Sequence, residues 1–213
     1  MDMLGGAIYN HYRSAPVLTN CAFSRNSAGS SGGGMSNAAS SPTLVNCSFS
    51  GNSGLWGGGM YNDSSSPVLT NCSFFGNSAY VGGGMANDVS SPALTNCILW
   101  GNTPEQIYDN EPESSPVVTY SSIEGGYQGE GNIDADPLLV DADNGDFHLS
   151  PDSPCIDAGN NDAHSLPDFD FEGDHRILDG DGNVTAIVDM GVDEVAVNWS
   201  YFRAYLPVVL KGY

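Results

Sequence analysis

A motif of eleven residues occurs four times in the first 102 positions of this chain. The copies read PVLTNCAFSRN from Pro16, PTLVNCSFSGN from Pro42, PVLTNCSFFGN from Pro67 and PALTNCILWGN from Pro92. Their cysteines follow one another at intervals of 26, 25 and 25 residues, and a run of glycines recurs in step. A fixed period of this length indicates units that cannot bury their apolar faces alone and therefore stack on their neighbours. The chain is thus expected to form a solenoid.

The third copy shows which secondary structure the repeat favours. Residues 58–62 and 68–74 are extended runs in which β-branched and aromatic residues alternate with small polar ones, with a bend expected at Asn71. The polar segment 63–67 separates the two runs, and Gly76 and Asn77 turn the chain back. Nothing in the copy has a helical period. Two or three short strands per repeat predict an all-β fold, a parallel β-solenoid whose coils lie ~4.8 Å apart.

Stacking turns each column of the alignment into a ladder of neighbouring side chains. Aliphatic and aromatic columns are expected to point inward, and asparagine columns are expected to bond through their amides at the bend and the turn. The expected ladders are Leu18, Leu44, Leu69 and Leu94; Phe23, Phe49, Phe74 and Leu99; Asn20, Asn46, Asn71 and Asn96; Asn26, Asn52, Asn77 and Asn102. A fifth, degraded coil is expected at residues 116–123.

The repeated cysteines, Cys21, Cys47, Cys72 and Cys97, are expected to remain reduced. Stacked at ~4.8 Å, they lie slightly too far apart for an unstrained disulfide, whose Cβ atoms are ~3.8 Å apart. We expect them to act as small buried apolar side chains.

The repeats resemble those of a group of surface proteins. GGAI at residues 5–8 and FSRN at residues 23–26 are similar to the GGA(I/L/V) and FxxN repeats of chlamydial polymorphic outer membrane proteins. More broadly, the chain resembles the right-handed parallel β-helix (pectin-lyase-like) superfamily, which includes pectate lyases and many bacterial surface proteins. The resemblance implies a right-handed helix of about five coils in a secreted bacterial protein, located outside the cell or at its surface.

The C-terminal part resembles the end module of secreted bacterial β-helix proteins. Its matching segments are DPLLV at 136–140, NGDFHL at 144–149, SPCIDAG at 153–159 and VDMGVDE at 188–194. We therefore expect three regions: β-helix repeats at 1–125, an acidic, loop-rich module capping the coils at 126–195, and an apolar strand or tail at 196–213.

Charge is concentrated in the second half of the chain. The net charge is −21, of which residues 1–100 contribute −1 and residues 101–213 contribute −20. Such a chain is not expected to bind nucleic acid or anionic lipid. No stretch approaches the ~20 apolar residues of a membrane-spanning helix. Residues 1–4 run directly into the first repeat, so we expect upstream coils and an export leader to be missing from the chain.

The repeat region offers little for catalysis. A polysaccharide lyase needs a basic residue to remove a proton and a cation to stabilise the developing charge, but the repeats hold no lysine and only Arg13 and Arg25. A hydrolase needs two or three carboxylates on one face, and the four repeats carry only Asp63 and Asp88. These two are expected to stack, and local turn hydrogen bonds explain them better than catalysis. We therefore expect no enzymatic activity, with a polysaccharide lyase or hydrolase as an alternative.

The acidic module contains a sequence suited to calcium. Asp179, Asp181 and Asn183 place oxygen ligands at positions 1, 3 and 5, as calcium loops do, although the rest of the EF-hand pattern is absent. Further ligands are available upstream at Asp168, Asp170 and Asp174. No cofactor is required by this interpretation, and calcium is an open alternative to an ordinary acidic surface. The neighbouring Arg176 is expected to neutralise nearby carboxylates.

Aromatic residues in turns and at outward positions are candidates for glycan contact. These are Trp56, Tyr61, Tyr80 and Trp100. A rigid face with aromatic rings among Ser, Thr and Asn suits sugar binding, and scattered surface aromatics are the alternative. The favoured function is a non-catalytic, adhesin-like module that contacts glycans or other cells. A second possibility is self-association through the solenoid ends, because head-to-tail stacking builds a fibre.

Overall fold

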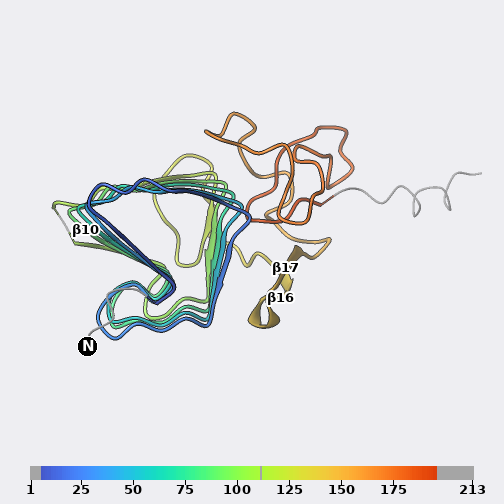
Figure 1. Cartoon of the computed structure of the whole chain (residues 1–213). Coiled ribbons are helices and arrows are strands. Elements are labelled where there is room, and N and C mark those ends of the chain that lie inside the picture. The colour runs from blue at the N-terminus through green and yellow to red at the C-terminus, as the bar shows by residue number, and fades with distance from the viewer. Residues whose placement is uncertain (1–5, 111, 196–213) are drawn as a thin grey trace, which may run out of the picture.

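A computed structural model of the chain describes residues 6–110 and 112–195. They contain a parallel β-solenoid of five coils, each with three short strands, which Figure 1 shows along its axis. Equivalent strands of successive coils pair in parallel, so three five-stranded sheets form the three sides. The all-β solenoid and its five coils, including the degraded fifth one, are confirmed.

The strands are two to four residues long, because each side of a coil is short. The first sheet holds β1 (Ile8–His11), β4 (Met35–Ala38), β7 (Met60–Asp63), β10 (Met85–Asp88) and β13 (Ile107–Asn110). The second holds β2 (Val17–Thr19), β5 (Thr43–Val45), β8 (Val68–Thr70), β11 (Ala93–Thr95) and β14 (Val117–Thr119). The third holds β3 (Ala22–Ser24), β6 (Ser48–Ser50), β9 (Ser73–Phe75), β12 (Ile98–Trp100) and β15 (Ser122–Ile123).

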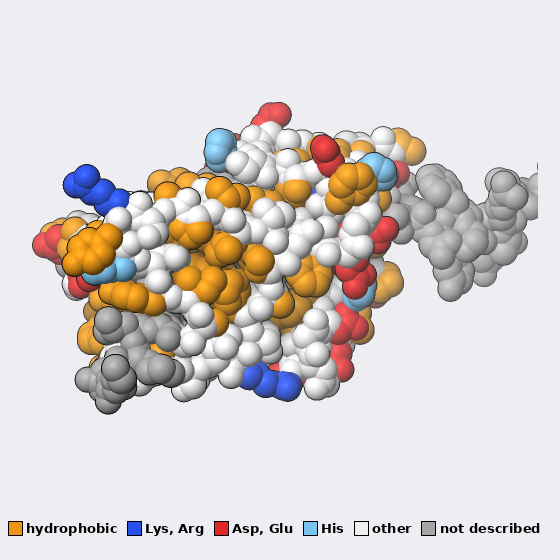
Figure 2. Space-filling view, viewed as in Figure 1, with side chains coloured by type: hydrophobic (Ala, Val, Ile, Leu, Met, Phe, Trp, Pro, Cys, Tyr) orange, Lys and Arg blue, Asp and Glu red, His pale blue; other side chains and the backbone are white. Residues whose placement is uncertain are grey.

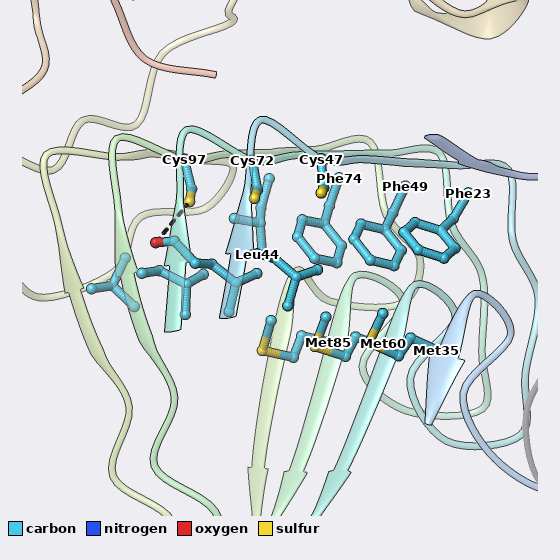
Figure 3. Close-up of a cluster of buried hydrophobic side chains, with 14 of the residues drawn as sticks. Phe23, Met35, Leu44, Cys47, Phe49, Met60, Cys72, Phe74, Met85 and Cys97 are labelled. Carbon is cyan, nitrogen blue, oxygen red and sulfur yellow. Dashed lines mark hydrogen bonds between the residues drawn. The ribbon is translucent and has the colours of Figure 1, made fainter. Parts of the chain in front are cut away.

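The interior is built from columns of identical side chains. Figure 3 shows Phe23, Phe49 and Phe74 in a stack, and their ring centroids lie 4.5 Å apart at each step. A methionine column, not expected from the sequence, lies beside it on the first sheet. The five cysteines are free thiols, and burial raises the pKa of Cys72 well above its usual range. The columns thus form one continuous apolar core.

The asparagine column at the turn is a complete amide ladder. The Asn52 amide donates to Oδ1 of Asn77 at 2.9 Å, and the Asn77 amide donates to Oδ1 of Asn102 at 2.8 Å. Each amide also bonds a backbone carbonyl of the preceding coil, such as that of Phe49. A second complete ladder, which sequence reasoning missed, runs through Asn10, Asn37, Asn62, Asn87 and Asp109 inside the first sheet.

The asparagine column at the bend is only partly self-bonded. All four members adopt a left-handed backbone, with φ between 50° and 56°, which asparagine tolerates better than most residues. Asn46 bonds Asn20, and Asn96 bonds Asn71. The amide of Asn71 donates instead to the carbonyl oxygens of Asp189 and Gly191. This column therefore attaches the C-terminal region to the coils.

The recurring glycine runs are explained by close backbone approach. A Cβ atom at Gly59 would lie 2.6 Å from the carbonyl oxygen of Gly84 and 2.8 Å from Cδ1 of Phe74. No side chain fits there, so glycine is required at this corner in successive coils.

Residues 126–135 cover the C-terminal end of the solenoid. Ile133 pairs with Ser122, and its N–H donates to the carbonyl of Ser121 at 2.9 Å. The N–H of Tyr120 donates to the carbonyl of Glu130 at 2.8 Å. The backbone groups that a sixth coil would pair with are thus partly bonded within the chain.

The remainder of the acidic module lies beside the coils rather than across their end (Figure 1). It begins with an antiparallel hairpin of β16 (Leu139–Asp141) and β17 (Asp146–Leu149), joined by a short 3-10 helix, η1 (Ala142–Asn144). Arg176 joins module and solenoid: its buried guanidinium bonds Oδ1 of Asn46 at 2.8 Å and pairs with Glu194 at 3.3 Å. The expected strand or tail at 196–213 lies outside the described residues.

The described residues include no helix with the length and apolarity needed to cross a membrane.

Candidate functional site

The outer surface of the first sheet carries a small aromatic hollow. Side chains alternate along each strand, so Met60 and Asn62 of β7 are buried inside while Tyr61 and Asp63 face outward. Register places Tyr61, Ala86 and Tyr108 in one outward column on consecutive strands. With Trp56 they line a hollow of about 140 Å³.

The hollow follows from a small residue between two large ones. Three successive strands place the tyrosines roughly 9–10 Å apart along the solenoid. Ala86 between them is only 1% exposed, so the flanking groups cover it. This strand spacing is about twice the ~4.5 Å at which the centroids of two aromatic rings stack.

Polar groups stand at one side of the hollow. Asp88 and Asn110 line it, and the Asn110 amide donates to Oδ1 of Asp88 at 2.8 Å. Asp63 is the register partner of Asp88 on the preceding coil. Burial, followed by the nearby carboxylates of Asp88 and Asp63, raises the pKa of Tyr61 to about 12, so its hydroxyl stays protonated. Aromatic walls with a few fixed polar groups are typical of ligand sites.

The structure brings together two of the four residues that the sequence suggested for glycan contact. Trp56 and Tyr61 line the hollow. Tyr80 is 75% exposed and does not line it, and Trp100 packs against a separate apolar cluster around Ile98. The sequence-based set missed Tyr108, Asp88 and Asn110. The sequence feature that indicates these residues is the similarity of IYDN at residues 107–110 to MYND at residues 60–63.

The proposed calcium ligands separate into two groups. Asp179 and Asp181 meet Asp157, which the sequence did not suggest, and one carboxylate oxygen of each lies within 4.8 Å of the others. Asn183 is adjacent, its amide bonded to Asp181. Oxygen atoms of this kind and number suit Ca²⁺ as part of a ligand set.

The upstream aspartates do not join that cluster. The buried carboxylate of Asp170 accepts the N–H groups of residues 172–174 and, through its second oxygen, that of Glu194. It therefore holds a loop rather than facing solvent. Asp168 and Asp174 flank the same loop, where the backbone of Asp168 bonds that of Arg176.

A larger groove lies between the third sheet and the module. It has a volume of about 500 Å³, and its walls include the serines Ser24, Ser48 and Ser50. His148 contacts Asp146 at 2.5 Å and Glu172 at 2.8 Å in this groove. Hydrogen bonding to Asp146 is the main cause that raises the pKa of His148 to about 9, so the imidazolium links the hairpin to the following loop. Sequence reasoning did not single out this cluster. The sequence feature that indicates it is the alternation of Asp146 and His148 along β17, which places both side chains on one face of the strand.

Comparisons with known proteins agree with the architecture. The family model described as "Right handed beta helix region" matches residues 1–133, more than half of the chain. Neither the curated proteins nor the solved structures gave a match to the chain. With three parallel sheets winding through five coils, the chain belongs to the right-handed β-helix family.

Proposed function

We propose that this chain is a non-catalytic, adhesin-like β-helix module that acts outside the cell or at its surface and binds glycans. The observation that carries the proposal is the hollow between Tyr61 and Tyr108, with Trp56, Asp88 and Asn110 around it. Sugar rings present an apolar face that stacks on aromatic rings and hydroxyl groups that bond carboxylates and amides.

The scaffold supports this use of the surface. Paired strands, amide ladders and a continuous core hold the outward side chains at fixed spacings, so binding requires little ordering of the protein. The resemblance of the repeats to chlamydial polymorphic outer membrane proteins and to pectin-lyase-like proteins favours a secreted protein at a bacterial surface.

The test is glycan binding by the intact chain and two variants. Tyr108→Ala and Trp56→Ala should each weaken binding by about tenfold or more, because each removes a wall of the hollow. Tyr80→Ala is the matched control, since this exposed tyrosine lies outside the hollow. Equal binding by all four proteins, or no binding to any array of glycans, would show the proposal to be wrong.

Self-association is a second candidate function, and the N-terminal end of the solenoid favours it. Within the described residues, β1, β2 and β3 each pair with a strand on one side only. Hydrophobic side chains gather in the middle of the end face turned to the viewer in Figure 2, and Leu18 and Cys21 of the first coil are only partly buried. Open strand edges of this kind are templates for pairing with another chain.

Polysaccharide cleavage is the third candidate, and the groove around His148 is where it would occur. Asp146, Glu172 and Asp193 bring three carboxylates to its walls. Incubation with pectin, alginate and related polymers, followed by detection of unsaturated or reducing ends, tests this alternative. Products that disappear in Glu172→Gln would overturn the non-catalytic proposal.

A further inference from the structure

Within the described residues, two carboxylates beside the aromatic hollow are not neutralised by a basic side chain. Asp63 and Asp88 occupy the same position on neighbouring strands, which places them about 4.8 Å apart in the ladder direction. Over residues 6–110 and 112–195, the ion pairs are those that His148 and Arg176 make in the C-terminal module. Neutral groups donate hydrogen bonds to these carboxylates: the Ser64 hydroxyl donates to Asp63, and the Asn110 amide donates to Asp88.

Such an arrangement attracts a cation. Like charges directly opposite each other on paired strands repel, so a positive group placed next to them reduces this repulsion. The negative faces of the aromatic rings of Trp56, Tyr61 and Tyr108 act in the same direction, since a ligand cation near such rings is stabilised electrostatically. An acidic sugar would meet repulsion at the same place.

We propose that the hollow selects an amino sugar: its pyranose ring enters between Tyr61 and Tyr108, and its protonated amine lies against Asp88, with Asp63 adding to the field. The inference rests on the proposed glycan function and names the class of glycan. Uronic acids and sulfated sugars are disfavoured by charge. N-acetylated sugars are disfavoured because the acetyl group removes the positive charge.

Three tetrasaccharides test the selection by isothermal titration calorimetry at mildly acidic pH. They are a glucosamine tetramer, its N-acetylated counterpart and tetragalacturonate. The glucosamine tetramer should bind at least about tenfold more tightly than the other two, because a charge-assisted hydrogen bond to a carboxylate is worth more than a neutral one. The preference should decrease as salt is added.

Matched variants connect the preference to the hollow. Asp88→Asn keeps an acceptor for Asn110 but removes the charge, and should reduce glucosamine binding to the level of the N-acetylated tetramer. Asp152→Asn, at an exposed aspartate of the module, should leave binding unchanged. Ala86→Leu fills the gap between the tyrosines without altering charge and should abolish binding, with circular dichroism confirming that the variant is folded.

The outcomes separate the two proposals. Equal binding of the glucosamine and N-acetylglucosamine tetramers, lost in Ala86→Leu, would overturn the amino-sugar selection and leave glycan binding at the hollow intact. Tighter binding of tetragalacturonate would also overturn it. Binding that survives in both Ala86→Leu and Asp88→Asn would place glycan contact elsewhere, and binding of none of the tetramers would count against both proposals.

Discussion

Asparagine acts in this protein as a structural residue with four different bonds. In the turn column, the side chain of Asn77 accepts from the N–H and the amide of Asn52 and donates to Phe49 and Asn102. Aspartate cannot donate, and serine is too short to bond both neighbouring coils. The amide is therefore suited to a buried column that has a coil above and a coil below.

Replacing Asn77 with alanine should destabilise the solenoid strongly. The change leaves the buried backbone N–H of Asn52 and one N–H of its side-chain amide unpaired, at about 1–3 kcal/mol for each group. We expect the free energy of unfolding in urea to fall by about 3–5 kcal/mol.

The control is Asn144→Ala, which removes an exposed amide that bonds the carboxylate of Asp141. It should change the free energy of unfolding by about 0.5 kcal/mol or less. A loss below about 1 kcal/mol in Asn77→Ala would mean that water or neighbouring amides replace the ladder bonds.

At the scale of the elements, periodic features were predictable and non-periodic ones were not. The phenylalanine, cysteine and leucine columns follow directly from a constant spacing, because every coil places them at the same position. The column that joins Tyr108 to Tyr61 is hidden from an alignment on the cysteines, because β10 and β13 are 22 residues apart whereas the two preceding steps are 25 residues each. The docking of Arg176 on Asn46 joins residues 130 apart in the chain and has no repeating signal at all.

The acidic module should lose stability as pH rises. Burial, and then the charge of Glu194, raises the pKa of Asp189 to about 8, whereas an aspartate in an unfolded chain has a pKa of about 3.9. Between these values the folded module binds a proton that the unfolded chain does not, so unfolding becomes easier by up to about 1.4 kcal/mol per pH unit. His148 acts in the same direction: its stabilisation is present below about pH 6.5 and is lost as pH rises through about 9.

Urea unfolding at a series of pH values between about 4 and 8 measures this slope. Asp189→Asn should flatten it, because the variant has no proton to lose at that position. Asp152→Asn should retain the full slope. Stability that increases with pH across this interval would contradict the expectation, since the pKa values of Asp157, Asp193 and Glu194 are also raised by burial.

Calcium should stabilise the same module through Asp157, Asp179 and Asp181. One oxygen of each carboxylate lies within 4.8 Å of the others, and a bound Ca²⁺ would offset their mutual repulsion. Calcium at about 100 times its dissociation constant would add about 2.7 kcal/mol, seen as a Tm that rises with calcium and falls in EDTA.

The double variant Asp179→Asn/Asp181→Asn should remove the response to calcium. Asp174→Asn is the matched control, because this aspartate belongs to the loop around Asp170. An unchanged Tm of the original protein in calcium and in EDTA would exclude a functional calcium site in this cluster.

At the scale of the whole molecule, the two ends of the solenoid are unlike each other. Residues 126–135 bond the last coil at one end, whereas β1, β2 and β3 present one unpaired side at the other within the described residues. Head-to-tail stacking needs both ends open, and the partial cover of the C-terminal end disfavours it. We therefore expect a solenoid of this kind to pair once through its open edges rather than to extend into a fibre.

Light scattering coupled to size exclusion tests this asymmetry. The chain should elute as a monomer of 22.3 kDa or as a dimer, with no larger species as concentration increases. Ile133→Pro removes the N–H that bonds Ser121 and loosens the cover, so this variant should form larger assemblies. A ladder of polymers from the unchanged chain would mean that residues 126–135 yield to an incoming coil, and self-assembly would then replace glycan contact as the favoured function.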